Sequence, residues 1–299
     1  MNSIEVVETN TILEFPEHGT EFNKAQFLSL SKNMLLYNAG VITFQQFKIN
    51  LTYEFLGMVR TADISKEQNF QVVENIAAIS KLVEAYFTEE KQEGKTVKIL
   101  EMVYYTQLLP KIKVDGVVFH GPDSALFNTV FGEYIQALTM FTDYSATANE
   151  DILDRLIATL YRPERAVNDP DDQEQEYSKD PRRKFNPELT DHYAQRLKKL
   201  SPNVKYAIYL FFASCQHFIA NTTDLDIGGG NQLDISILFK KQAGAKTSKG
   251  LGMVGTLYSI AETKVFGNVK DVAGQNTYDV FAYLVDQNHK MEELKKKKK

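Results

Sequence analysis

The fold class is decided by one stretch of the chain, Ser201-Pro-Asn-Val-Lys-Tyr-Ala-Ile-Tyr-Leu-Phe-Phe-Ala-Ser-Cys-Gln-His-Phe-Ile-Ala220. Ser201 can cap a helix, and Pro202 suits the first helical position because its missing N–H has no intrahelical partner there. Residues 204–220 are apolar on almost every side, which is typical of a helix packed inside the molecule. We therefore expect a central, buried helix over Val204 to Ala220.

Amphipathic helices are predicted on both sides of this stretch. Thr43-Phe-Gln-Gln46 has the form of a capping box, and apolar residues follow it at helical spacing as far as Met58. Ser65-Lys-Glu-Gln68 has the same form and predicts a helix that ends near Glu93-Gly94. Similar patterns predict the remaining helices over 24–37, from Asp123 or Ser124 to 141, 150–161, from Asn186 onward, 253–264, and through 278–285. The sequence thus indicates a mainly α, helical bundle-like architecture.

One segment has a strand pattern. Lys111-Ile-Lys-Val-Asp-Gly-Val-Val-Phe119 alternates around Asp115-Gly116, a pair that tolerates a type I′ turn. We expect a single small β element, a hairpin near residues 108–120. Val97 to Leu109 can supply a third strand, but its content of β-branched residues is modest and a helix is the alternative.

The chain is expected to divide at a polar stretch, and four of its eight prolines lie within 163–187. We interpret Pro163 to Phe185 as a linker or a surface excursion, with a helical domain over 1–162 and another over 186–294. Asn168 to Lys179 is expected to be mobile, because it has little apolar surface to offset the entropy of ordering. The lysines at 295–299 are expected to form a disordered tail.

Composition excludes several classes of protein. The chain has 299 residues and a net charge of −5, which disfavours a dedicated nucleic-acid binder. Its single cysteine cannot form an internal disulfide, and residues 1–8 lack the order of a signal peptide. The strongest apolar stretch, 207–213, is too short to cross a bilayer. We expect a protein that is made and kept in a reducing cytoplasm.

Gly250-Leu-Gly-Met-Val-Gly255 matches the glycine pattern of dinucleotide-binding loops, which lets backbone approach a pyrophosphate at a helix start. Such a loop follows directly on a strand, whereas Lys240 to Lys249 intervene here after Phe239. We interpret the pattern as a flexible loop before a helix and predict no cofactor.

The other candidate sites favour structural interpretations. Asp224 to Asp234 resembles a calcium loop, but it lacks the ligand at position five and has Ile235 where the bidentate Glu belongs. The five histidines show no metal-binding spacing, and Cys215 is interpreted as a buried core thiol. The basic clusters, Arg182-Arg183-Lys184 and Lys295 to Lys299, are interpreted as solvated ends. We predict no catalytic or metal-binding residues.

Several segments together resemble an uncharacterised family of tailed-bacteriophage and prophage proteins, of the kind encoded in the place of tail assembly chaperones. They span nearly the whole chain: Glu21-Phe-Asn-Lys-Ala-Gln-Phe27, Gly121-Pro-Asp123, Leu160-Tyr-Arg-Pro163, Asp180-Pro-Arg182, Phe185-Asn-Pro187, Val265-Phe-Gly-Asn-Val269 and Tyr278-Asp-Val-Phe281.

The sequence shows many well-capped amphipathic helices and no convergent set of acid, base and nucleophile, which favours an interaction protein over an enzyme. Together with the resemblance, this implies a virion assembly factor that binds apolar helical segments of a protein partner, such as a tape measure chain. A structural head or tail connector of the virion is the alternative. A nucleotide-binding enzyme working through Gly250 to Gly255 is the alternative from another class. A homo-oligomer is compatible with the sequence, and neither a membrane nor nucleic acid is expected as a partner. The resemblance places the protein in the host cell cytoplasm, with the virion as the alternative location.

Overall fold

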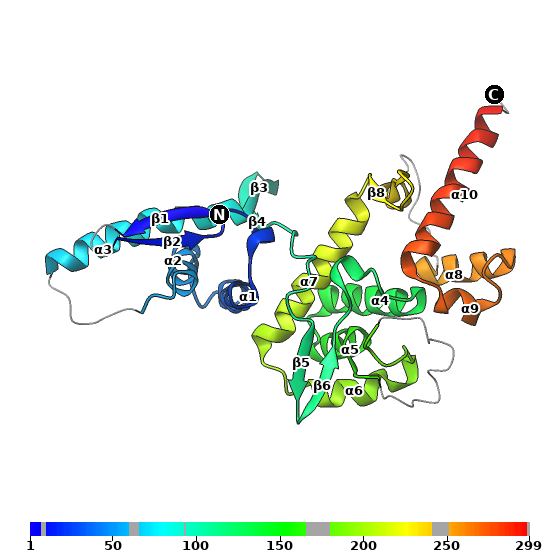
Figure 1. Ribbon diagram of the computed structural model, residues 1–299, viewed down its shortest axis with the longest axis horizontal. Helices are drawn as coiled ribbons and strands as arrows, with labels where there is room; N and C mark the ends of the chain where they lie inside the picture. Colours follow the sequence, from blue (N-terminus) through cyan, green and yellow to red (C-terminus); the bar gives the residue numbers. More distant parts are fainter. Residues whose placement is uncertain (7–9, 60–65, 93, 166–179, 241–250, 298–299) are drawn as a thin grey trace. The chain divides into compact units, whose positions relative to one another are not determined.

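The computed structural model describes residues 1–6, 10–59, 66–92, 94–165, 180–240 and 251–297. Contacts between residues divide the chain into two units, which we treat separately (Figure 1). Unit 1 comprises Met1–Tyr104 and Ser201–Leu210, and unit 2 comprises Tyr105–Leu200 and Phe211–Lys299. Helices predominate in the described residues and the sheets are small and antiparallel, which confirms the expected mainly α class.

Unit 1 begins with a hairpin that the sequence did not predict, β1 (Asn2–Val6) paired with β2 (Thr11–Phe15). The helices α1 (Lys24–Asn38) and α2 (Phe44–Phe55) follow, as predicted. Both begin at complete capping boxes, in which the side chains of Asn23 and Thr43 accept from the backbone N–H three residues later. Phe22 lies among the rings of Phe55, Tyr86 and Tyr104, which form the aromatic core of this unit.

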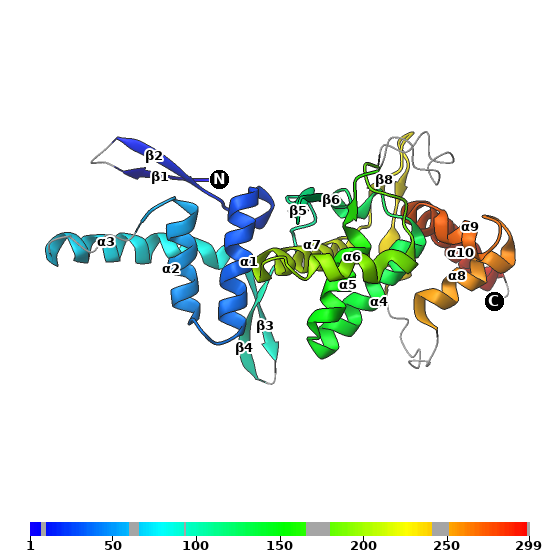
Figure 2. The same cartoon turned by 90° about the horizontal axis from the view of Figure 1, so that it is seen from below.

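The third predicted helix ends earlier than expected. α3 (Lys66–Ile79) leads into a 3₁₀ segment, η2 (Ser80–Tyr86), and then into an antiparallel hairpin of β3 (Phe87–Gln92) and β4 (Lys95–Leu100), seen in Figure 2. The prediction of a helix to Glu93-Gly94 was therefore wrong, as was that of a single β element. The cause is tertiary: Phe87 packs edge-on against Phe44 and Phe47 of α2, at 5.1 and 5.6 Å between centroids.

Unit 2 contains the predicted hairpin, β5 (Lys111–Val114) and β6 (Val117–His120). Its turn has positive φ at both Asp115 (49°) and Gly116 (80°), as a type I′ turn requires. The third strand is β7 (Arg162–Pro163), which pairs with β6. The segment Val97 to Leu109, considered for that role, instead contributes its first residues to β4 in unit 1.

Neighbouring helices of unit 2 pack against one another. α4 (Phe131–Thr147) lies beside α5 (Glu150–Leu160), and α5 lies beside α6 (Thr190–Leu197), which follows the short η5 (Pro187–Leu189). The helix expected from Asp123 or Ser124 is only the 3₁₀ turn η3 (Ser124–Leu126) before α4 begins at Phe131. Asn149 and Asn186 cap α5 and η5 through their side chains.

The predicted central helix is α7 (Pro202–Asn221). Its buried residues include Ala207, Ile208, Leu210, Phe211, Phe212, Cys215 and Ile219, so its expected burial is confirmed. Its residues up to Leu210 group with unit 1, and those from Phe211 group with unit 2.

The chain then forms β8 (Leu225–Asp226), β9 (Gln232–Leu233) and η6 (Ile235–Leu238). Three helices follow: α8 (Gly252–Thr263), α9 (Val269–Gly274), which was not predicted, and α10 (Thr277–Lys297). α10 includes Lys295 to Lys297, which the sequence analysis assigned to a disordered tail. Among the described residues, no helix is both long and apolar enough to cross a membrane.

The structure divides the chain differently from the sequence analysis, which placed a linker or surface excursion at 163–185. The described ends of that stretch meet inside unit 2: Arg165 N–H donates to the Pro181 carbonyl and Arg183 N–H donates to the Pro163 carbonyl, both at 2.9 Å. Glu164 and Arg182 form an isolated antiparallel bridge between them. The segment predicted to be mobile, Asn168 to Lys179, lies outside the described residues.

Candidate functional site

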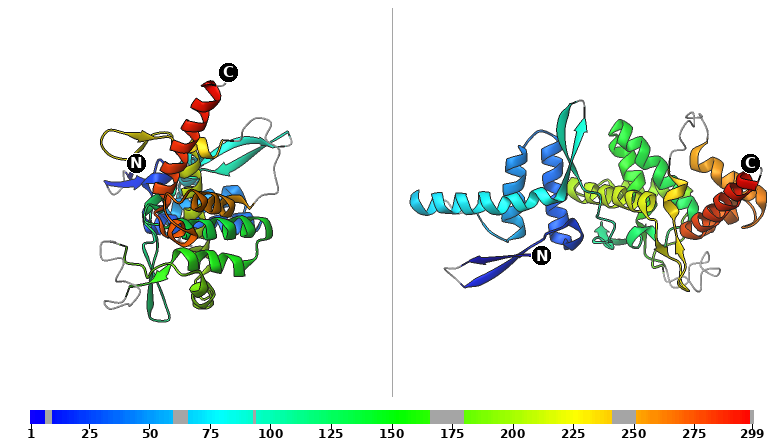
Figure 3. Two further views of the ribbon diagram at one scale, coloured as in Figure 1. Left: turned by 90° about the vertical axis from the view of Figure 1, so that its right-hand side faces the viewer. Right: turned by 90° about the horizontal axis from the view of Figure 1, so that it is seen from above.

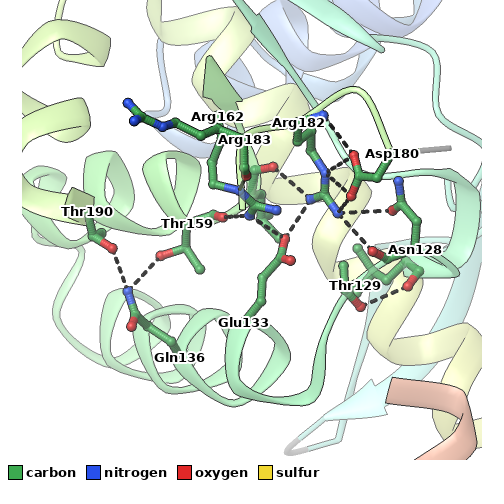
Figure 4. Close-up of polar contacts among 12 residues, drawn as sticks. Asn128, Thr129, Glu133, Gln136, Thr159, Arg162, Asp180, Arg182, Arg183 and Thr190 are labelled. Atoms are coloured by element: carbon green, nitrogen blue, oxygen red, sulfur yellow. Dashed lines mark hydrogen bonds and ion pairs between the residues drawn. The ribbon is translucent and has the colours of Figure 1, made fainter. Parts of the chain in front are cut away.

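Unit 2 contains a buried cluster of charged side chains centred on Glu133 of α4 (Figure 4). Glu133 Oε1 lies 2.6 Å from Arg182 Nη1 and 2.9 Å from Arg162 Nη1, and all three side chains are buried. Asp180 completes the cluster, with Oδ2 at 2.8 Å from Arg182 Nη2. Two guanidinium groups thus balance two carboxylates.

Arg182 is the most connected member of this cluster. Besides the carboxylates, its guanidinium donates to the carbonyls of Leu160 and Asn128 at 3.1 and 3.0 Å. Burial disfavours the charged form of Arg182, but Glu133 and Asp180 outweigh this effect and raise its pKa. The interpretation of Arg182 as a solvated basic residue was therefore wrong, because its ion pairs with Glu133 and Asp180 stabilise it in the interior. These contacts hold residues 180–183 against α4, which is a structural role.

The glycine pattern at 250–255 is only partly described, because Gly250 lies outside the described residues. Gly252 is the first residue of α8 and has φ of +55°, and Gly255 lies inside the same helix. The nearest described element before it is the 3₁₀ turn η6, whereas a dinucleotide fingerprint requires a strand there. Gly252 is thus explained by its backbone conformation, since positive φ favours glycine.

The loop that resembles a calcium site is a small hairpin between β8 and β9. Asp226 accepts a hydrogen bond from the Gly228 N–H at 2.8 Å, and Asp234 accepts one from the Ser236 hydroxyl. These carboxylates support the local turns. Over the residues that the structure describes, no group of three or more His, Cys, Asp or Glu side chains is placed to hold a metal ion.

Cys215 and the histidines, the remaining candidates from the sequence, do not form a common site in the described residues. Cys215 is fully buried, and burial raises the pKa of its thiol well above the ordinary value, whereas His217 on the same helix is exposed. His120 of β6 is also buried, with Nε2 at 3.8 Å from Glu164 Oε1. Burial lowers the pKa of His120, so its neutral form is favoured.

A surface feature that the sequence did not reveal lies between α8 and α9. A pocket of about 590 Å³ is lined by residues of these helices and of the turn that joins them, which we call the α8–α9 groove: Tyr258, Ala261, Glu262, Lys264, Gly267, Asn268 and Val269. Tyr258 and Val269 remain 48% and 39% exposed. The groove therefore presents an aromatic ring and an aliphatic side chain to solvent.

The turn between the two helices is built by local backbone chemistry. α8 ends at Thr263 and is capped by Lys264 in the left-handed conformation. Gly267 has φ of +93°, which only glycine adopts readily. Asn268 then caps α9 by accepting from the N–H groups of Lys270 and Asp271, while Asp271 accepts from the Asn268 N–H. The shape of the groove is thus fixed by a short, tightly capped connection.

The rest of unit 2 holds both helices in place. α9 packs against the start of α4, where a Cβ on Gly132 would lie only 3.1 Å from the Ala273 Cβ. The hydroxyl of Tyr283 on α10 lies 3.4 Å from the Thr263 hydroxyl, and its ring packs edge-on against Phe266. α8 nevertheless buries only Ile260 among its residues. Its other apolar residues, such as Met253, Val254 and Leu257, are only half-buried, so α8 keeps part of its apolar surface exposed to solvent.

No protein-family model, curated protein or solved structure that was compared with the chain matches it.

Proposed function

We propose that this chain is a non-enzymatic assembly factor of a tailed bacteriophage that binds an apolar helical segment of another virion protein, such as a tape measure chain. The observation that carries the proposal is the α8–α9 groove, whose lining includes the exposed Tyr258 and Val269 and the half-buried Ala261. The resemblance of several segments to proteins encoded in the place of tail assembly chaperones supports the same assignment.

The groove suits a helix more than an extended peptide. An extended peptide is typically recognised through main-chain hydrogen bonds to an open sheet edge, whereas this groove is formed by two helices and a turn. Side chains of a third helix can enter the furrow between two packed helices, as in ridges-into-grooves packing. Glu262 and Lys264 border the groove and offer one charge of each sign to orient the segment.

Complementation of a phage that lacks this gene tests the proposal. Val269→Asp places a carboxylate in the groove, yet it suits the first turn of α9, where a negative charge is favourable. We expect this variant to fold normally but to leave infected cells without assembled tails. The matched control is Ile227→Asp, which alters an aliphatic residue that is 54% exposed in the β8–β9 hairpin, and we expect it to support assembly.

Normal tail assembly with Val269→Asp would refute the role of the groove. Mass spectrometry of purified virions separates the proposed chaperone from the alternative of a structural connector. We expect the protein to be abundant in infected cells and missing from virions, whereas stoichiometric amounts in the particle would favour the connector.

A further inference from the structure

The C-terminal half of α10 extends beyond the body of unit 2 (Figures 1 and 3). Its first half packs through buried residues such as Phe281 and Val285, whereas every residue from 289 to 297 is exposed. This exposed part is not uniformly polar, because Met291 and Leu294 are 56% and 58% exposed. A helix end with apolar side chains in solvent gains stability from a partner that covers them.

Three apolar side chains and the amide of Gln287 follow a short coiled-coil spacing. Leu284 and Met291 are seven residues apart, and Gln287 and Leu294 are three residues further along from each. With Leu284 and Met291 at position a, Gln287 and Leu294 occupy position d, so all four share one face of the helix. We call these four residues the α10 stripe.

Lysines flank the α10 stripe. In the same register Lys290 occupies position g and Lys295 occupies position e, the two positions that border a coiled-coil seam. The acidic residues of this part, Asp286, Glu292 and Glu293, occupy positions b and c, which point away from the seam. The helix therefore separates its charges, with positive groups beside the stripe and negative groups behind it.

The ion pairs that Lys290 and Lys295 form within α10 do not prevent these lysines from binding a partner. Lys290 Nζ lies 2.5 Å from Asp286 Oδ2, and Lys295 Nζ lies 2.7 Å from Glu292 Oε1. All four side chains are at least half exposed, and exposed pairs of this kind contribute little to stability. A partner with acidic groups at the seam can therefore compete for the lysines.

The charge pattern opposes a second copy of this chain as the partner. In a parallel pair, position g of one helix faces position e of the next heptad in the other, so Lys290 would face Lys295. In an antiparallel pair, e faces e and g faces g, which again brings lysines together. We propose that the α10 stripe binds an amphipathic helix of a different protein whose positions e and g are acidic. This inference does not depend on the α8–α9 groove, which is made by other residues.

Two synthetic helical peptides with the same leucine and isoleucine seam test this inference against the full chain. One peptide carries Glu at every e and g position and the other carries Lys, so that neither pairs with itself. By fluorescence anisotropy we expect the acidic peptide to bind at least tenfold more tightly than the basic one, with an affinity that falls as salt rises.

Adjacent lysines provide matched variants. Lys295→Glu reverses a charge beside the stripe, whereas Lys296→Glu makes the same change at position f on the far side. We expect Lys295→Glu to weaken binding of the acidic peptide at least fivefold and Lys296→Glu to change it less than twofold. Met291→Asp should abolish binding while far-UV circular dichroism shows an unchanged fold.

Three outcomes would overturn the inference. Equal binding of both peptides, or none, would remove the role of the flanking lysines. Concentration-dependent dimers in sedimentation that Met291→Asp dissociates would assign the stripe to a second copy. Duplex DNA binding that is lost in Lys295→Glu, without binding of the acidic peptide, would assign the lysines to nucleic acid.

Discussion

Replacing Arg182 by alanine should strongly destabilise unit 2. The change removes one of the two positive charges that balance Glu133 and Asp180, so the cluster is left with a net charge of −1. It also removes hydrogen bonds to the carbonyls of Leu160 and Asn128. Breaking a buried ion pair by deleting one partner costs about 3–5 kcal/mol. At about 2–4 °C per kcal/mol for a unit of this size, the melting temperature should fall by roughly 6–20 °C.

Differential scanning calorimetry measures this shift, and another arginine in the same unit provides the control. Arg155 Nε lies 2.6 Å from Asp191 Oδ1, but the two side chains are 48% and 67% exposed. Arg155→Ala should therefore cost at most about 1 kcal/mol. Arg182→Lys keeps the charge but not the fork of donors, and should fall between the two. If Arg182→Ala and Arg155→Ala melt alike, the cluster does not stabilise the fold as argued.

Three further predictions concern pH, thiol reactivity and the glycine pattern. Hydrogen bonds from Lys48 and Lys98 lower the pKa of Glu84 from 4.5 to about 2, so the stabilisation by its carboxylate is lost as pH falls across that interval. The melting temperature of Glu84→Gln should therefore fall less than that of the wild type between pH 5 and pH 3. Cys215 should react with a thiol reagent only after unfolding, and rapid labelling in native buffer would contradict its burial. Gly252→Ala should cost about 1 kcal/mol in urea denaturation because of its positive φ, and titration calorimetry with NAD or ATP should give no heat for the wild type.

Local signals in the sequence were sufficient where neighbouring residues alone decide the structure. The capping box of Thr43 and Gln46 places the start of α2. Asp115-Gly116 fixes the β5–β6 turn, because both residues adopt positive φ at low cost. Such features depend on atoms within a few residues of one another, and their signatures are therefore readable from one sequence.

Features that depend on distant residues were missed. Strand β3 contains Glu89, Glu90 and Lys91, which have weak strand preferences, and its position follows from the packing of Phe87 onto α2. Arg182 is buried because Glu133, 49 residues earlier, pairs with it. The α8–α9 groove was also missed, because the sequence does not show which side of an apolar helix stays uncovered.

Site-specific photocrosslinking in infected cells tests the central claim most directly. A benzophenone amino acid replaces Tyr258 in the α8–α9 groove or, as the control, Ile227 in the β8–β9 hairpin, and crosslinked peptides are identified by mass spectrometry. We expect the probe at position 258 to crosslink to one contiguous, apolar helical segment of a tail protein, and the probe at position 227 not to do so. Crosslinks from position 258 that match those from position 227, or that never reach a tail protein, would contradict the account.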